Sequence, residues 1–215
     1  MLLLCFFLFA CSGKIDLLSQ LDAVFTKEAK AMKIRKNNYT DYVDYYLPSD
    51  LSEEESGKLS NTFRYGESSV IMNVNIAGII NTKYYEEQDI VNEGFFDESR
   101  SLYRRNAYYL NTDGDSREYL YELYRYEDHY LLYFISPELV FYGYVSEEDV
   151  IPLTSRILLI AKSASVKDED VIAVYSSKDV IDYQKKQVNL FETIMPVNGV
   201  IHDLMTDEAK ESLND

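Results

Sequence analysis

The side chains that most often carry out chemistry in proteins are sparse in this sequence. Its two histidines are His129 and His202, and an aspartate neighbours each of them in the chain. A zinc site with imidazole ligands usually needs two or three converging histidines, and a serine triad needs one histidine that a carboxylate orients. Sequence neighbours seldom pair across a site, so we interpret both histidines as surface residues. The glycine patterns of nucleophile elbows, phosphate loops and dinucleotide sites are absent from the sequence.

One run of oxygen-bearing residues has some features of a calcium loop. Asn111, Asp113 and Asp115 alternate along the chain, and Glu122 follows them. A helix-flanked calcium loop requires glycine at its sixth place, whereas Ser116 stands there and both flanks have strand patterns. We therefore predict a hairpin turn at this run, with a weak surface calcium site as the alternative.

Acidic residues dominate the charge of the chain. The sequence has 37 Asp and Glu against 21 Lys and Arg, for a net charge of −16. Phosphate backbones repel such a surface, so we expect no nucleic acid partner. We interpret the acidic runs at 53–55 and 147–149 as solvated turns, and we expect no catalytic activity, cofactor or metal. The alternative, an enzyme of the cell wall, would need two acids that face each other across a cleft at about 5–9 Å.

The first residues carry an export pattern. Residues 2–10 contain no polar side chain, and the sequence turns polar directly after Cys11. A membrane-spanning helix needs about 20 apolar residues, whereas the apolar core of an export signal has roughly 7–15. The sequence from Leu8 through Phe9 and Ala10 to Cys11 resembles the lipobox of bacterial lipoprotein precursors. An uncleaved hydrophobic end or a buried first strand is the alternative interpretation of the run.

The resemblance to lipoprotein precursors implies where the protein is located in the cell. Residues 1–10 would be a signal peptide, and Cys11 would carry a diacylglyceryl group on its thiol, with fatty chains such as palmitate. Two acyl chains anchor firmly, because each buried methylene contributes about 0.8 kcal/mol and a single chain binds only marginally. The folded part would then lie on the outer face of the bacterial cytoplasmic membrane. Both cysteines, Cys5 and Cys11, lie in this segment, so no disulfide framework is expected.

Hydrophobic periodicity predicts a mixed α+β fold in one extracytoplasmic domain at 11–205, followed by a disordered acidic tail at 206–215. Short links made of turn-forming residues force neighbouring strands to pair antiparallel, so we expect a meander within a sheet of five or more strands. The predicted elements are, in chain order, a long amino-terminal helix at 15–36, a polar connection at 39–67, a strand at 70–77, meander strands at 102–111, 117–126, 130–135 and 139–145, a helix near 153–165, a strand at 171–175 and an alternating segment at 187–195.

Tyrosine is unusually frequent, with 20 residues beside 10 phenylalanines and no tryptophan. Its large apolar ring and polar tip suit half-exposed sheet positions and protein interfaces alike. Most tyrosines fall in the predicted meander, at positions of both parities. The candidate interaction surface consists of Tyr119, Tyr121, Tyr124, Tyr126, Tyr142 and Tyr144.

The function that the sequence predicts follows from the anchor and from the absence of catalytic motifs. We expect a membrane-anchored lipoprotein that acts as a non-catalytic interaction or accessory module of the cell envelope. Its partners would be the membrane, through lipidated Cys11, and an envelope or secretion-system protein. A lipoprotein that binds a small molecule, peptide or glycan is the alternative.

Overall fold

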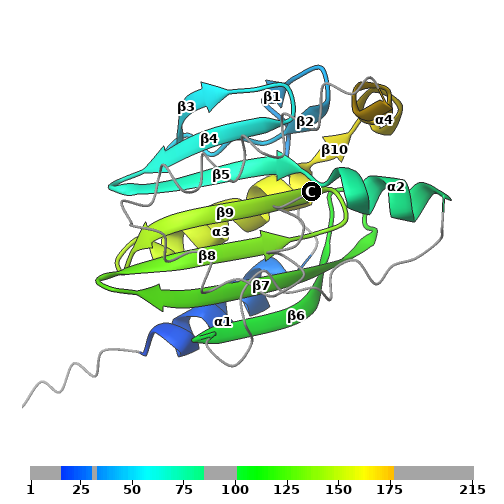
Figure 1. The fold of residues 1–215 in the computed structure, drawn as a ribbon. Coiled ribbons are helices and arrows are strands. Elements are labelled where there is room, and N and C mark those ends of the chain that lie inside the picture. Colours follow the sequence, from blue (N-terminus) through cyan, green and yellow to red (C-terminus); the bar gives the residue numbers. More distant parts are fainter. Residues whose placement is uncertain (1–15, 31–32, 85–100, 177–215) are drawn as a thin grey trace, which may run out of the picture.

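The computed structural model of the chain describes residues 16–30, 33–84 and 101–176 (Figure 1). Within these ranges the chain forms four helices and two antiparallel sheets, so the fold is mixed α+β, as the sequence predicted. Several predictions concern residues outside the described ranges: the signal peptide, Cys11, the segment at 187–195, His202 and the tail at 206–215.

Seven strands form the larger sheet, in the order β3-β4-β5-β9-β8-β7-β6. Each neighbouring pair runs antiparallel. The strands are β3 (Ser52–Ser56), β4 (Ser60–Tyr65), β5 (Ser68–Val74), β6 (Tyr103–Leu110), β7 (Ser116–Tyr126), β8 (His129–Ile135) and β9 (Leu139–Ser146). The last four confirm the predicted meander to within about two residues at each end.

The turn between β6 and β7 is the run that has features of a calcium loop. The side-chain oxygen of Asn111 accepts hydrogen bonds from the backbone N–H groups of Asp113 (3.0 Å) and Asp115 (2.8 Å). Gly114 has a φ of 90°, a conformation that glycine adopts without strain. These contacts fold the run into a tight hairpin turn, as predicted.

A smaller sheet and the edge of the larger one occupy the stretch predicted as a polar connection. The prediction at 39–67 is wrong, because β2 (Val43–Tyr45) pairs with β1 (Asn38–Tyr39) and β10 (Ser165–Val166), and β3 and β4 follow it. Strands this short leave almost no alternation in the sequence. The acidic run at 53–55 is exposed, as predicted, but it lies in edge strand β3 and not in a turn. Charged side chains on an edge strand discourage pairing with other chains.

The described helices are α1 (Leu17–Glu28), α2 (Ile76–Tyr84), α3 (Val150–Ser163) and α4 (Asp168–Ser176). Helix α3 confirms the helix predicted near 153–165, shifted by two or three residues toward the amino terminus. Helix α1 contains 12 residues and ends at Glu28, so the long helix predicted at 15–36 is not confirmed. That α1 is the first element of the chain stays a prediction, because residues 1–15 lie outside the described ranges.

Two predicted strands are helical in part or in whole. The strand predicted at 70–77 ends at Val74, and Asn75 then starts α2 by accepting a hydrogen bond from the Gly78 N–H (3.0 Å). The strand predicted at 171–175 is helix α4. Its three acids at 168–170 occupy the first turn, where negative charge stabilises a helix, and only Val171 is buried in it. A strand inside a sheet would bury more of these residues.

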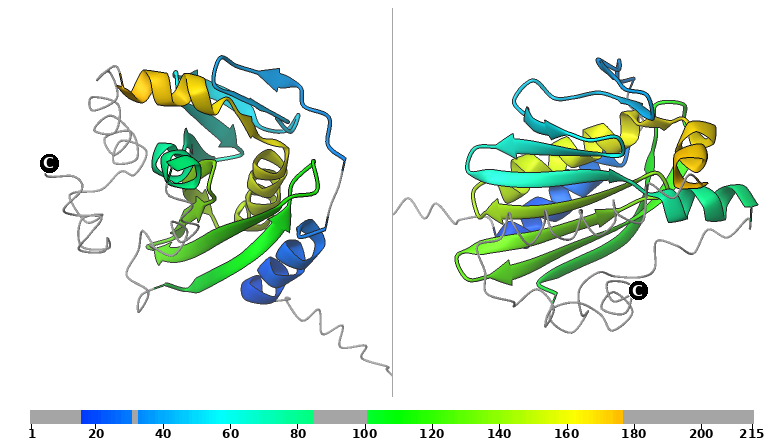
Figure 2. Two further views of the ribbon diagram at one scale, coloured as in Figure 1. Left: turned by 90° about the vertical axis from the view of Figure 1, so that its right-hand side faces the viewer. Right: turned by 45° about the horizontal axis from the view of Figure 1, so that its top comes forward.

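Helices α1 and α3 pack side by side on one face of the seven-stranded sheet (Figure 2). Phe25 of α1 lies against Tyr119 and Tyr121 of β7, with ring centroids 5.6 and 4.9 Å apart. The Tyr121 hydroxyl lies 2.9 Å from the Thr154 hydroxyl of α3, within hydrogen-bond distance. We call this side the helix-covered face. The opposite side, which we call the second face, carries Ile71, Leu120, Leu131, Tyr133 and Tyr142.

A buried lysine explains why α1 ends where it does. Lys162 of α3 is 1% exposed, and its ammonium donates to the backbone carbonyls of Glu28 and Lys30, each at 2.7 Å. The Glu28 carboxylate lies 3.8 Å from the same nitrogen, and the Ala29 carbonyl accepts from the Leu110 N–H of β6. Burial lowers the pKa of Lys162, and the Glu28 carboxylate opposes this shift. The terminal carbonyls of α1 are therefore satisfied by α3 and β6, and not by a further helical turn.

We expect Lys162→Ala to lower the free energy of unfolding by about 3 kcal/mol, because it removes the buried ammonium that binds the Glu28 and Lys30 carbonyls and leaves the Glu28 carboxylate with the exposed Lys27 as its cation. Urea denaturation followed by circular dichroism measures the change. Lys27→Ala is the matched control, since the Lys27 side chain is 80% exposed, and its effect is expected within about 0.5 kcal/mol. Equal effects of the two variants would contradict this role of Lys162.

Burial also determines how the tyrosines titrate. It raises the pKa of Tyr119 to about 12, an effect that Arg105 partly opposes, and it raises the pKa of Tyr142 to about 12. Burial raises the pKa of Tyr103 to about 12 as well, and the Asp22 carboxylate adds to this shift. These phenols therefore resist ionisation in the folded state more than in the unfolded state.

The raised pKa values predict the alkaline behaviour of the fold. Below the ordinary tyrosine pKa of 10.0 these phenols are neutral in both states, so they add no pH dependence. Above it the unfolded chain releases their protons first, and stability should fall steadily toward pH 12. Phenolate absorbance and circular dichroism, recorded across one titration, should show these tyrosines ionising together with unfolding. Complete ionisation before any loss of structure would contradict the burial of these rings.

Candidate functional site

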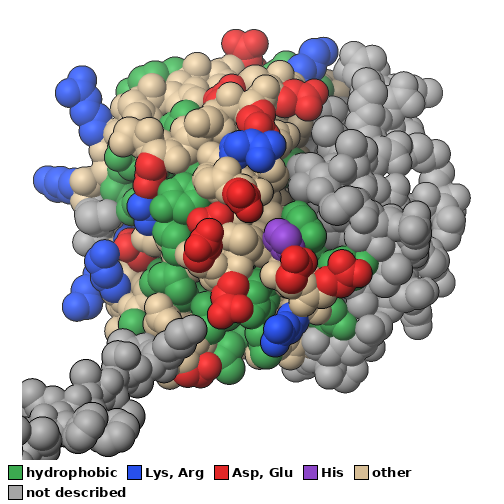
Figure 3. Space-filling model, turned by 90° about the vertical axis from the view of Figure 1, so that its left-hand side faces the viewer, with side chains coloured by type: hydrophobic (Ala, Val, Ile, Leu, Met, Phe, Trp, Pro, Cys, Tyr) green, Lys and Arg blue, Asp and Glu red, His purple; other side chains and the backbone are tan. Residues whose placement is uncertain are grey.

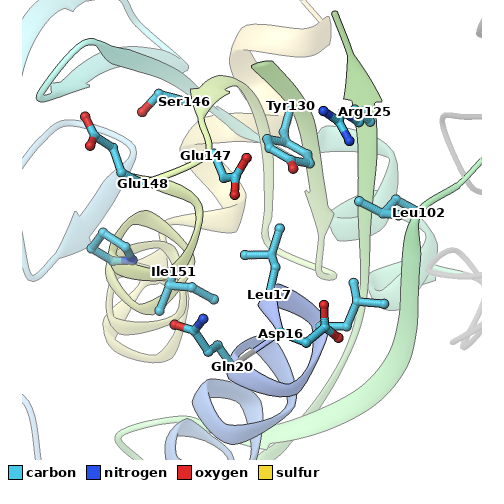
Figure 4. Close-up of a pocket in the computed structure, with 12 residues that line it drawn as sticks. Asp16, Leu17, Gln20, Leu102, Arg125, Tyr130, Ser146, Glu147, Glu148 and Ile151 are labelled. Atoms are coloured by element: carbon cyan, nitrogen blue, oxygen red, sulfur yellow. The ribbon is translucent and has the colours of Figure 1, made fainter. Parts of the chain in front are cut away.

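An open cleft lies at the end of the sheet where α1 and α3 begin (Figure 4). Its volume is about 1090 Å³. The start of α1 forms one wall, the ends of β7 and β8 form another, and the turn from β9 into α3 forms the third. We call it the amino-terminal cleft, and its central residues are Asp16, Leu17, Arg125, Tyr130, Glu147 and Ile151.

The polar side of the cleft is built by neighbouring strand ends. Arg125 lies near the end of β7, Tyr130 near the start of β8, and Glu147 in the turn after β9, so the antiparallel register brings them to the same end of the sheet. Burial raises the pKa of Tyr130, the nearby Glu147 carboxylate adds to the shift, and Arg125 opposes it. Figure 4 shows the Tyr130 ring and the Glu147 carboxylate pointing into the cleft.

The helical side of the cleft is apolar. Leu17 and Ile151 are half-buried and pack against the main core, and Leu102 of the strand wall is 41% exposed. A surface with an apolar floor and a charged rim suits an amphipathic ligand, because the floor supplies hydrophobic contact and the rim fixes orientation.

Acidic side chains surround the cleft. Figure 3 looks onto this end of the molecule and shows several Asp and Glu side chains gathered on it. Among the described residues that line the cleft, Arg125 is the sole cation. The acids at this end, in or beside the cleft, come from the start of α1 and from three turns: Asp16, Glu67, Glu127, Asp128, Glu147 and Glu148.

The buried carboxylate of Asp149 holds the turn into α3 in place. Asp149 is 8% exposed and accepts a hydrogen bond from the Ser68 hydroxyl at 2.7 Å. Gly66 has a φ of 57°, and an added Cβ there would lie 2.9 Å from the Asp149 carboxylate. The prediction of a solvated turn at 147–149 is therefore confirmed for Glu147 and Glu148 and is wrong for Asp149, whose contacts fix the position of its two neighbours.

The six tyrosines of the predicted interaction surface do not share one face. Tyr119 and Tyr121 are 2% and 0% exposed and point into the helix-covered face. Tyr124, Tyr126, Tyr142 and Tyr144 lie on the second face, where Tyr124 and Tyr126 are buried and the other two are half-buried.

The predicted surface histidine at 129 is half-buried. Its Nδ1 atom lies 2.7 Å from the Asp128 carboxylate, and its ring stacks on Tyr144 with centroids 4.4 Å apart. The hydrogen bond to His129 lowers the pKa of Asp128. Among the described residues no group of three or more His, Cys, Asp or Glu side chains is arranged to hold a metal ion.

Sequence reasoning did not single out Arg125, Tyr130 or Leu17. They come from separate elements, and only the strand register and the docking of α1 bring them together. The sequence offered only an indirect signal for the cleft. The turns at 127–128 and 147–149 place the end of β7, the start of β8 and the end of β9 at the same edge of the sheet.

Comparison with known proteins adds no family to these observations, since no family model and no curated protein matches the sequence. No helix among the described ranges has the length and apolar content needed to cross a bilayer.

Proposed function

We propose that the chain is a membrane-anchored extracytoplasmic lipoprotein and a non-catalytic interaction module of the cell envelope, which binds a basic segment of a partner protein in the amino-terminal cleft. Cys11 would be the lipidated residue and the first residue of the mature chain, so that α1 would be its first element. The observation that carries the proposal is the position of the cleft, whose wall begins at Asp16.

The short spacing between anchor and cleft limits where the cleft can lie. Asp16 follows Cys11 by five residues, and an extended chain spans at most about 3.6 Å per residue, or roughly 18 Å in total. A lipidated Cys11 would therefore hold the cleft near the bilayer surface. Partners that reach it would be membrane proteins of the same bilayer, or segments that lie along its surface.

The charge around the cleft favours a cationic partner segment. Asp16, Glu147 and Glu148 line the cleft beside its apolar floor, and further acids stand in turns at the same end of the sheet, so a peptide with basic and apolar residues would match both. Attraction of this kind is screened over about 10 Å at 0.1 M salt. Binding should therefore weaken as ionic strength rises.

The cleft is less suited to the two other functions considered from the sequence. Its volume of about 1090 Å³ lies at the upper limit of the roughly 300–1,000 Å³ of small-molecule sites, and it is open. Asp16 and Glu147 lie on its walls but are exposed, whereas a general acid in a glycosidase sits in apolar surroundings. An extended protein segment fits this shape better.

Charge reversal at the cleft tests the proposal. A photoreactive amino acid at Leu102, on the cleft wall, should cross-link one envelope protein in intact membranes, and the same group at Tyr39, which is 68% exposed on β1, should not. The double variant Glu147→Lys with Glu148→Lys should lower the cross-linked yield by about tenfold, equivalent to about 1.4 kcal/mol of binding.

The matched control carries the same charge change on edge strand β3, as Glu53→Lys with Glu55→Lys, both at exposed positions. It should leave the yield unchanged. An equal loss in both double variants would show a dependence on net charge alone and would contradict binding in the cleft. Unchanged yield in the cleft variant would contradict it as well.

A further inference from the structure

A pocket lies at the carboxyl end of α1, where that helix meets α3 and the connection from β2 to β3. Its volume is about 520 Å³, and we call it the lysine pocket. The charged side chains that line it within the described ranges are Lys27, Glu28, Lys30, Asp50, Arg156 and Lys162. Four of them are cations and two are acids, although the chain has a net charge of −16. The lysine pocket is therefore locally positive, in contrast to the amino-terminal cleft, where the described lining has three acids and one cation.

The two acids of the lysine pocket are already paired with cations. Asp50 accepts hydrogen bonds from the Nε and Nη2 atoms of Arg156, at 3.1 and 2.6 Å. The Glu28 carboxylate lies near two ammonium groups, 3.8 Å from that of Lys162 and 3.7 Å from that of Lys27. One carboxylate therefore faces two cations here, and Lys30 adds a further positive charge to the same pocket.

Lys27 and Lys30 retain hydrogen-bond donors for a ligand. The Lys27 ammonium lies farther from Glu28 than a hydrogen bond allows, and its side chain is 80% exposed. Lys30 is exposed as well, and its ammonium forms no hydrogen bond or ion pair with another described residue. Two like charges at one concave site repel each other, and an anion bound between them removes this repulsion.

We propose that the lysine pocket binds a phosphate group, with the Lys27 and Lys30 ammonium groups as its charged donors. Hydrogen bonds from an ammonium group to phosphate oxygens are charge-assisted and roughly twice as strong as those between neutral groups. Arg156 can supply further donors, since its contacts to Asp50 and to the Pro152 carbonyl use three of its five N–H groups. The same contacts fix the guanidinium in place before a ligand arrives, which lowers the entropy cost of binding.

The lysine pocket suits a small phosphate compound better than a polyanion. Its volume lies within the roughly 300–1,000 Å³ of small-molecule sites. Helix α1 has 12 residues, so the acids of the amino-terminal cleft lie about 18 Å away, at its other end. That distance exceeds the screening length of about 10 Å at 0.1 M salt, so those acids repel a small anion in the pocket only weakly. A nucleic acid would instead extend over the acidic surface. A soluble phosphate ester and a phospholipid headgroup both present the required group.

Titration of inorganic phosphate into the full chain, at constant ionic strength, tests the proposal. The backbone amide signals of Lys30 and Ser155 in nuclear magnetic resonance spectra should shift and saturate. The double variant Lys27→Gln with Lys30→Gln should raise the dissociation constant by about tenfold, because it removes both charged donors. The matched control, Lys33→Gln with Arg35→Gln, removes two charges at exposed positions outside the described pocket lining, and it should change the constant by less than about twofold. Absence of saturable shifts, or equal weakening in the two double variants, would overturn the proposal.

Vesicle flotation then identifies the source of the phosphate group. If the ligand is a lipid headgroup, phosphatidylglycerol vesicles should recover more of the wild-type chain than of the Lys27 and Lys30 double variant, with the control double variant recovered like the wild type. Equal recovery of all three chains, together with the expected phosphate titration, would identify a soluble phosphate compound as the ligand. The apolar residues 2–10 are common to the three chains and do not affect the comparison. Neither measurement depends on lipidation of Cys11 or on the amino-terminal cleft.

Discussion

The structure depends on the need to bury both faces of one antiparallel sheet. Strands β5, β7, β8 and β9 carry large apolar side chains at positions of both parities, so neither face can be left to water. Helices α1 and α3 cover one face, and the core between them and the sheet is built around Phe25 and the tyrosines of β7. The residues of the second face, such as Ile71, Leu120 and Leu131, are equally withdrawn from solvent.

The amino-terminal cleft is a consequence of how α1 is fixed. Its carboxyl end is tied to α3 and β6 through Lys162 and the Ala29 carbonyl, and Phe25 holds its middle against β7. Its first residues are then placed beside the strand ends that carry Arg125 and Tyr130. The shape of the cleft and its closeness to the proposed anchor thus follow from the same packing. The acids around it come mostly from turns.

The sequence predicted the elements whose signals are local. Turn residues such as Gly114 and Pro137 lie between runs of strand-forming residues, so the meander could be placed, and the apolar spacing after Pro152 predicted α3. Elements whose stability comes from distant partners could not be predicted. Strand β2 is short and pairs with β10, far along the chain. Helix α1 ends where the Lys162 ammonium donates a hydrogen bond to the Glu28 carbonyl. Val171 to Tyr175 has strand-forming residues, but its acidic first turn and tertiary position make it helical.

The candidate site was harder to predict than the fold. Strand parity decides whether a tyrosine faces the helices or the second face, and Tyr119 and Tyr142 fall on opposite sides. Tyrosine content alone therefore could not define one surface. The cleft combines residues from α1, β7, β8 and the turn into α3, whose sequence separation exceeds 100 residues between Leu17 and Glu147. Only the docking of α1 brings them together.

The central claim is that acylation of Cys11 holds the cleft beside the membrane. Intact-mass and peptide mass spectrometry of the protein extracted from native membranes tests it most directly. The account predicts a mature chain that begins at Cys11 and carries a diacylglyceryl group, and a Cys11→Ala variant that is neither acylated nor cleaved. A native chain recovered from the soluble cell fraction, without acyl groups and with residues 1–10 still attached, would contradict it.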